Sequence, residues 1–203
     1  MLCCAGATPR RWKSEMTYVP TPSQTVGPFF SIGLSALCRE KIECGSAEGQ
    51  RVVIRGRILD GDGQPVPDAV LEIWQASEAA RGDCEEETSV RREKIPTGFG
   101  RIATNERGEF RFSTIKPAPR RDEDGLMYAP HLAVVLLMRG LLRHLLTRVY
   151  FAGEAANGED AVLKLVPSER RQTLLAEPSE ESPSELSWDV YLQGERETVF
   201  FEA

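Results

Sequence analysis

The stretch Ala129–Phe151, APHLAVVLLMRGLLRHLLTRVYF, contains the densest apolar run of the chain and both of its histidines. A bilayer-spanning helix needs roughly 20 apolar residues with almost no charge, whereas three arginines interrupt this run. The pattern instead predicts two strands, Leu132–Met138 and Leu145–Phe151, joined by a turn at Arg139-Gly140. Five consecutive apolar residues follow Ala133, which indicates a strand buried on both faces. The core of a β-sandwich supplies that environment.

Alternating patterns elsewhere predict further strands. In Arg51–Asp60, apolar residues at positions 52, 54 and 58 share one face, opposite the arginines at 55 and 57. Asp60-Gly61-Asp62-Gly63 is a strong turn signal. The other predicted strands are Ala69–Gln75, Phe99–Thr104, Glu109–Ile115, Ser187–Gln193 and Glu197–Phe201, with irregular loops at 76–98 and 116–130. About eight strands, with short helices expected at Ser31–Arg39 and Ser168–Ala176, predict a single all-β sandwich.

Composition excludes several classes of protein. A chain of 203 residues is long enough for one domain with a sizeable core. The net charge of −6 argues against a nucleic-acid partner, because phosphate binding needs a basic face. Much of the acid lies in Asp83–Glu87 and Glu177–Glu185, which we expect to be solvated loops. The five cysteines are an odd number without framework spacing, which is typical of reduced thiols in a cytoplasmic protein.

Residues 1–50 are predicted to form a tail and an extended arm ahead of a sandwich domain at 51–203. The first fifteen residues lack the apolar core of a signal peptide, and Met16 would open a more ordinary sequence. We therefore expect residues 1–15 to be disordered or an artefact of start-site choice. A metal site at Cys3-Cys4 is disfavoured, because adjacent cysteines in an untethered terminus chelate poorly. Prolines in TPSQTVGPFF, residues 21–30, predict the arm.

Taken alone, the residues give little support to an independent enzyme. No G-x-S-x-G motif is present, and two histidines among many Ser and Asp residues are weak evidence for a hydrolytic triad. No His/Cys cluster has the spacing of a zinc site. An iron site would need several converging ligands, and the strand that begins near His131 has Ala133 where a second histidine would be required.

Several segments, in order over about residues 20–203, carry a family resemblance. They are TPSQTVGPFF, GRILDGDGQPVPDAVLEIWQA, FGRIATNERGEFRFSTIKP, APH, RG, TRVYF, RRQTL and GERETVFFEA. Together they resemble the α subunits of protocatechuate 3,4-dioxygenases, in the intradiol ring-cleaving dioxygenase family. The resemblance implies the sandwich fold and a chemistry in which catechols are cleaved between their hydroxyls by non-haem Fe(III), held by two Tyr and two His.

The resemblance also implies that this chain lacks the iron site. His131 corresponds to the first histidine of the family's H-x-H motif, and Ala133 replaces the second. The two expected tyrosines fall at about Gly82 and Arg120. This is the α-subunit pattern, so Fe(III) is expected in the partner β subunit, with no metal ligand or catalytic residue in this chain alone. We expect His131 to be a hydrogen-bonded core or interface residue.

In the family, α and β subunits pair with the substrate cleft at their junction. The resemblance assigns substrate binding in this chain to Thr25, Gly27, Pro28, Phe29 and Arg139. A flat aromatic anion needs an apolar wall and a cation, and arginine can bind a carboxylate bidentately. Without the resemblance, Arg139 would be interpreted as an ordinary turn residue and Phe29 as an interface or core anchor. Trp74 and Trp188 are expected in the core.

The resemblance therefore predicts an iron-free α subunit that is inactive alone. With its β partner, in a higher oligomer of αβ protomers, it would convert protocatechuate (3,4-dihydroxybenzoate) and O2 to 3-carboxy-cis,cis-muconate in cytoplasmic aromatic catabolism. No nucleic-acid or membrane partner is expected. The alternative is a non-catalytic assembly module with the same fold, in which case the partner would be active alone. A self-sufficient dioxygenase is disfavoured by the missing ligands.

Overall fold

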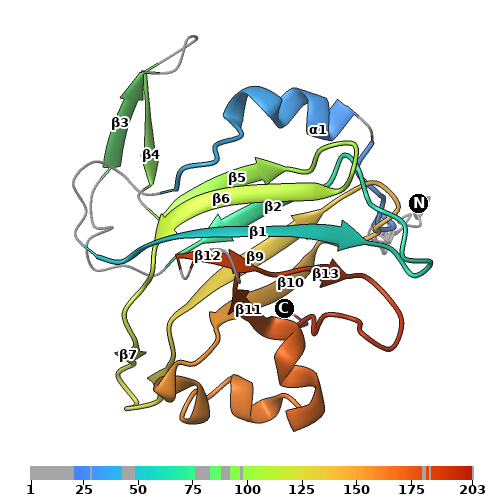
Figure 1. The fold of residues 1–203 in the computed structure, drawn as a ribbon. Helices are drawn as coiled ribbons and strands as arrows, with labels where there is room; N and C mark the ends of the chain where they lie inside the picture. Colours follow the sequence, from blue (N-terminus) through green and yellow to red (C-terminus); the bar gives the residue numbers. More distant parts are fainter. Residues whose placement is uncertain are drawn as a thin grey trace, which may run out of the picture.

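The computed structural model describes residues 21–27, 29–42, 49–75, 83–87, 92–96, 98–179, 182 and 184–202. Strands dominate, and the helices are few and short (Figure 1). The helices are α1 (Phe29–Leu34) and the 3-10 helices η1 (Ser35–Leu37), η3 (Ala155–Gly158), η4 (Leu163–Leu165) and η5 (Ser168–Leu174). The predicted mostly-β class is confirmed. No helix in the described part of the chain has the length and apolar character needed to cross a membrane.

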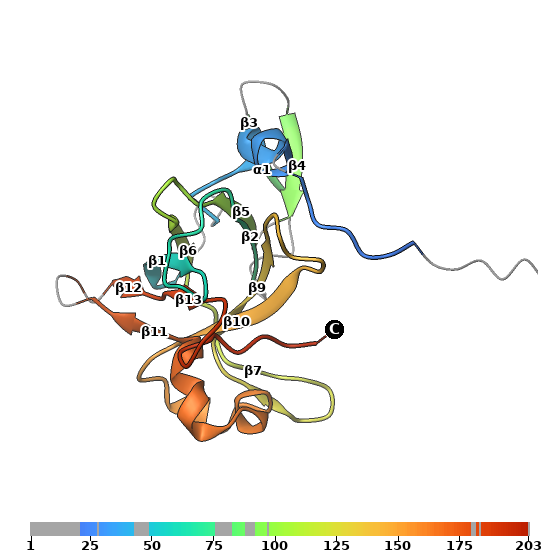
Figure 2. The ribbon, with the colours of Figure 1, turned by 90° about the vertical axis from the view of Figure 1, so that its right-hand side faces the viewer.

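Nine strands form one strongly curled sheet. They are β1 (Arg51–Leu59), β2 (Val70–Trp74), β5 (Phe99–Ala103), β6 (Glu109–Ile115), β9 (His131–Leu137), β10 (Leu145–Phe151), β11 (Leu175–Pro178), β12 (Glu185–Ser187) and β13 (Val190–Tyr191). Their order is β13-β1-β12-β11-β10-β9-β2-β5, with β6 also paired to β1. Viewed end-on, the sheet curls so that β1 and β6 lie across the interior from β2 and β9 (Figure 2).

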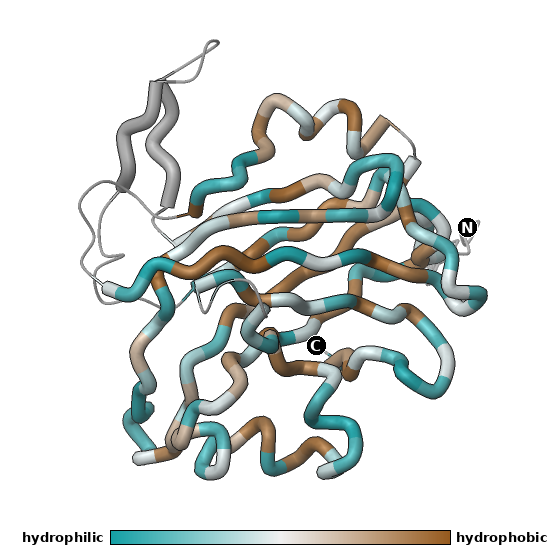
Figure 3. The backbone as a smooth tube through the Cα atoms, viewed as in Figure 1, coloured by the Kyte–Doolittle hydropathy of each residue, from teal (hydrophilic) through white to brown (hydrophobic). Residues whose placement is uncertain are grey.

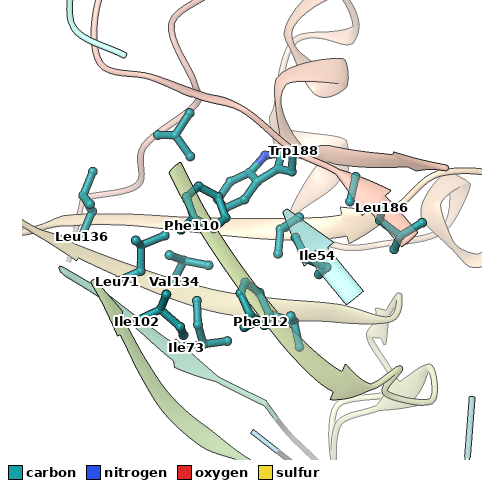
Figure 4. Close-up of a cluster of buried hydrophobic side chains, with 14 of the residues drawn as sticks. Ile54, Leu71, Ile73, Ile102, Phe110, Phe112, Val134, Leu136, Leu186 and Trp188 are labelled. Carbon is teal, nitrogen blue, oxygen red and sulfur yellow. The ribbon is translucent and has the colours of Figure 1, made fainter. Parts of the chain in front are cut away.

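Side chains from the two halves of the sheet meet in the core. Ile54 of β1 and Phe112 of β6 belong to the same buried cluster as Ile73 of β2 and Val134 of β9 (Figure 4). Each of these four is at most 1% exposed, and burying such a side chain contributes about 1.5–3 kcal/mol. The alternation predicted for β1 is confirmed. Brown segments along the strands in Figure 3 follow the same apolar pattern.

Strand β9 differs from its prediction on one face. Leu132, Val134 and Leu136 point into the core and are almost completely buried. The alternate residues Ala133 and Val135 are only partly buried, so the prediction of a strand buried on both faces is wrong for this chain. The described residues cover the outer face of β9 incompletely, which leaves an apolar surface there.

Several connections were also predicted incorrectly. The loop 76–98 contains a hairpin of β3 (Asp83–Glu87) and β4 (Arg92–Pro96), and the loop 116–130 contains the short pair β7 (Arg120–Arg121) and β8 (Met127–Tyr128). The acidic stretch 177–185 is partly strand at both ends. Residues 197–201, predicted as a strand, make only a single bridge, from Phe201 to Leu146. An alternating pattern favours extended backbone, but it does not reveal whether a neighbouring strand is available to pair.

The two tryptophans have different environments. Trp188 is 2% exposed and packs edge-on against Phe110 in the core, as predicted. Trp74 is 46% exposed at the end of β2, so its prediction as a core residue is wrong. Its ring lies 4.4 Å from that of Phe99 on β5, on the outer side of the sheet. Trp74 therefore extends the incompletely covered surface beside β9, where it pairs with Ala133.

Candidate functional site

The N-terminal arm contacts the turn between β9 and β10. The backbone N–H of Gly140 donates a hydrogen bond to Oγ1 of Thr25, with 2.6 Å between the nitrogen and the oxygen. Gly140 has a φ of 93°, a conformation that glycine adopts without steric cost, which explains the turn at Arg139-Gly140. The arm then enters α1, where the N–H of Phe30 donates to the carbonyl of Gly27 over 3.0 Å. The arm and the turn, 115 positions apart at this contact, thus form one local structure.

Arg139 forms an ion pair beside this contact. Its Nε lies 2.8 Å from Oδ2 of Asp68, which belongs to the turn between β1 and β2. The Arg139 side chain is 59% exposed and the Asp68 side chain 27% exposed. Exposed ion pairs usually contribute less than about 1 kcal/mol to stability. This pair therefore contributes little to holding the fold together, but it places the guanidinium of Arg139 beside Asp68.

A groove of ≈ 720 Å³ lies next to the arm and the turn. Val26 of the arm lines it, together with Leu142 of the turn and Leu146 of β10. Phe200 and Phe201 near the C-terminus contribute aromatic surface, and the N–H of Phe201 is bonded to the carbonyl of Leu146 over 2.8 Å. Small-molecule sites are typically apolar concavities of about 300–1,000 Å³ with a few polar groups, so the groove has a suitable size and lining.

Of the residues predicted to bind substrate, none that the structure describes lines this groove. Thr25 lies against the turn that carries Arg139, as a shared site requires. Phe29 is 80% exposed and does not line the groove. A Cβ on Gly27 would meet no atom within 4 Å among the described residues, so the space in front of the arm is open. Pro28 lies outside the described residues.

Sequence reasoning missed three features of this site. Asp68 belongs to a motif interpreted only as part of a family signature, and nothing local connects it to Arg139. Val26 and Phe201 were treated as parts of an arm and of a strand. No sequence signal could have found Asp68, because it faces Arg139 through the register of the β2–β9 ladder, in which Val70 pairs with Leu137, and only the structure gives that register.

His131 offers one imidazole, which cannot by itself hold Fe(III). Its Nδ1 lies 2.7 Å from the carbonyl oxygen of Ala129; a carbonyl only accepts hydrogen bonds, so Nδ1 carries the proton. Burial lowers the pKa of His131, as do the nearby charges of Arg148 and Arg120, while the bond to Ala129 opposes the shift. The ring therefore offers one neutral nitrogen, Nε2, and the charges of Arg148 and Arg120 act on it.

The other positions at which the resemblance would place ligands do not complete a site. Arg120 places its guanidinium 4.8 Å from the centre of the Tyr128 ring, so a cation occupies one predicted tyrosine position. Ala133 has no donor atom, and Gly82 lies outside the described residues. Within the described ranges, no three His, Cys, Asp or Glu side chains are grouped so that they could hold a metal ion. Of the four positions that correspond to the family's ligands, only His131 therefore has a side chain of the required type.

A second groove of ≈ 740 Å³ lies on the β1–β6 side and is rich in arginine. At least three of its four arginines already face acids. Arg57 pairs with Asp189 at 3.3 Å, and Arg111 lies 4.0 Å from Glu40. The groove also contains Cys38, whose thiol pKa is raised by burial and which is therefore poorly nucleophilic. The groove beside the arm is the stronger candidate, because it adjoins the contact between Thr25 and the turn that carries Arg139.

Comparison with known proteins gives a consistent result. The sequence model of a family described as Dioxygenase matches residues 27–194. The protocatechuate 3,4-dioxygenase alpha chain of Burkholderia cepacia is 40% identical, over 92% of this chain and 98% of that protein. The beta chain from the same organism is 28% identical, over 78% of this chain and 71% of that one.

Solved structures show the same fold. The crystal structure of 3-chlorocatechol 1,2-dioxygenase from Rhodococcus opacus 1CP superimposes with a TM-score of 0.58. The match covers 86% of this chain and 68% of that one, at 22% sequence identity. The curled sheet is therefore shared with this dioxygenase.

Proposed function

This chain belongs to the intradiol ring-cleaving dioxygenase family, and on that premise we propose that it acts as the iron-free α subunit of a heteromeric protocatechuate 3,4-dioxygenase. The complex would cleave protocatechuate with O2 to 3-carboxy-cis,cis-muconate, in the cytoplasm. The curled sheet is then the family's β-sandwich. The identity to an alpha chain over nearly its whole length carries this proposal, and the lack of a donor side chain at Ala133 and at Gly82 supports it.

In this proposal the chain supplies part of a substrate pocket. Thr25 anchors the arm to the turn that carries Arg139, which supports a shared binding role for residues distant in the sequence. Arg139 would bind the substrate carboxylate, since the charge and planar N–H donors of a guanidinium match a carboxylate. Gly27, Pro28 and Phe29 would present the backbone and an aromatic ring to the pocket from the exposed side of the arm.

The partner is proposed to be the iron-binding β subunit, and several such αβ protomers would form the enzyme. The partly buried outer face of β9 and the exposed Trp74 and Phe29 support this assignment. Apolar surface of this kind marks interaction sites when it is contiguous. Iron and its ligands would come from the partner, and the role of this chain is to hold the substrate and to shape the site.

One observation favours the alternative of a non-catalytic assembly module. Arg139 is already paired with Asp68, as a purely structural arginine would be. Under that alternative, substitution of Arg139 would leave the kinetics of the complex unchanged, and the β chain would be active by itself.

Iron content and protocatechuate-dependent O2 uptake test the proposal. Both are measured for this chain alone, for the β chain of the same source alone, and for the two co-expressed. We expect an iron-free, inactive chain and an iron-containing, active complex. Full activity of the β chain alone would support the assembly module, and iron with activity in the isolated chain would refute both functions.

A further inference from the structure

Asp68 and Arg139 face each other because of the strand register. In the antiparallel β2–β9 pair, Val70 lies opposite Leu137. Continuing this register by two residues beyond the ladder places Asp68 opposite Arg139, and their side chains meet there over 2.8 Å. The ion pair thus extends a β ladder, and it is not a chance meeting of two flexible surface side chains.

Asp68 is held unusually firmly for a turn residue. Its φ of 60° makes it the single non-glycine residue with a positive φ among those the structure describes, a conformation that Asp and Asn tolerate better than other side chains. The buried Thr104 fixes the turn on both sides. Its Oγ1 donates to the carbonyl of Val66 and accepts from the N–H of Ala69, each over 3.0 Å.

The contact leaves part of the guanidinium available. Arg139 meets Asp68 through Nε, and a guanidinium has five N–H donors in a rigid planar fork. Fixing one edge of that plane determines the direction of the remaining donors. Thr25 holds the backbone of the turn that carries Arg139, through its hydrogen bond with Gly140. Arg139 is therefore held through both its side chain and the neighbouring main chain.

We propose that Asp68 is a positioning residue, which orients Arg139 so that its remaining N–H donors face the carboxylate of the substrate. This inference rests on the proposed function, because it needs Arg139 to bind that carboxylate. Strained backbone persists where the surrounding structure enforces it, and such residues cluster at ligand-binding sites. The positive φ of Asp68 and the hydrogen bonds of Thr104 to its turn are then explained by the need to hold the Asp68 carboxylate in one place.

The test compares variants in the αβ complex, with protocatechuate and catechol as substrates. Asp68→Gly removes the carboxylate while accommodating the positive φ, and Asp68→Asn keeps both the conformation and an acceptor oxygen. For Asp68→Gly we expect KM for protocatechuate to rise about tenfold with kcat nearly unchanged, within the coupling range of residues in direct contact. Catechol, which has no carboxylate, should be unaffected, and Asp68→Asn should recover part of the loss.

The two single variants and the double variant separate this inference from the proposed function. If Arg139→Ala leaves protocatechuate kinetics unchanged, Arg139 does not bind the carboxylate, whatever the effect of Asp68→Gly. If Arg139→Ala raises KM and Asp68→Gly does not, only the positioning role is overturned. In the Arg139→Ala background, Asp68→Gly should not raise the KM for protocatechuate further. An additive rise in KM in the double variant, or an equal loss with catechol, would also overturn the positioning role of Asp68.

A measurement without turnover keeps the inference testable if a variant complex does not assemble. The Nε–H resonance of Arg139 in the isolated chain is identified by its disappearance in Arg139→Lys. In Asp68→Asn, and in Asp68→Gly if that variant folds, this resonance should move and exchange with solvent faster. An unchanged resonance would show that Asp68 does not orient Arg139.

Discussion

Oγ1 of Thr25 accepts a hydrogen bond from the backbone nitrogen of Gly140 at 2.6 Å, across 115 positions of the sequence. The bond fastens the N-terminal arm to the turn between β9 and β10. Because Arg139 immediately precedes Gly140, the bond also places the backbone of Arg139 beside the arm. In the proposed function, a substrate pocket built from the arm and this turn would be formed before the substrate arrives.

Replacing Thr25 with valine should loosen the arm. Valine keeps the shape of threonine but cannot accept the hydrogen bond, whose net contribution is about 0.5–1.5 kcal/mol. We expect faster hydrogen exchange at the Gly140 amide and a higher KM for protocatechuate in the complex. Thr25→Ser, which retains the hydroxyl, is the matched control. Equal exchange rates in the valine and serine variants would mean that the hydroxyl does not hold the turn.

Replacing Arg139 with alanine should weaken the binding of protocatechuate selectively. The loss of a charged hydrogen bond predicts a rise in KM equivalent to roughly 1–3 kcal/mol. Catechol turnover should change much less, because catechol has no carboxylate. Arg139→Lys, which keeps the charge without the planar fork, should fall between wild type and alanine. Equal losses on both substrates would indicate a defect of assembly.

The lowered pKa of His131 predicts that stability declines on the acid side. Because burial disfavours the charged ring, the unfolded chain binds this proton more readily than the folded chain. The stabilisation is complete above the ordinary histidine pKa of 6.5 and is lost as pH falls from there through the lower folded pKa. Arg148 and Arg120 reinforce the shift, while Asp160 and the Ala129 carbonyl oppose it.

Urea unfolding on either side of pH 6.5 measures this effect. His131→Asn is the control, because an asparagine amide can donate to the Ala129 carbonyl but does not titrate. The free energy of unfolding of the wild type should fall more steeply than that of the control between pH 7.5 and 5.5, which bracket the unperturbed value of about 6.5. Parallel pH profiles for the two proteins would contradict the prediction.

Trp74 should report on assembly with the β subunit. Its ring is 46% exposed, and it lies beside the partly covered face of β9, where a partner is proposed to pack. We expect Trp74→Ser to change the melting temperature of the isolated chain little but to weaken the complex, by about 2 kcal/mol if the ring is a central contact. Leu165→Ser is a matched control, since Leu165 is 83% exposed on η4. Equal dissociation constants for the two variants would place the interface elsewhere.

The strands of the core were predictable because their signal is local. Val52, Ile54 and Ile58 alternate with arginines, and this period alone places them on one face of β1. The two strands on either side of Arg139-Gly140 were predictable from another local signal, a continuous apolar run interrupted at a turn. Local patterns do not show, however, whether another segment packs over a given face of a strand. Trp74 and the outer face of β9 were therefore predicted to be buried, although this chain covers them only in part.

The sequence by itself determined the mostly-β class, the limits of the central strands, the family and the absence of a second histidine at Ala133. The tertiary structure decided that Thr25 holds the turn at Gly140 and that Asp68 faces Arg139. The physical reason is range. Periodic burial is encoded within a few neighbouring residues, whereas these polar contacts depend on strand register and chain path, which join residues far apart in the sequence.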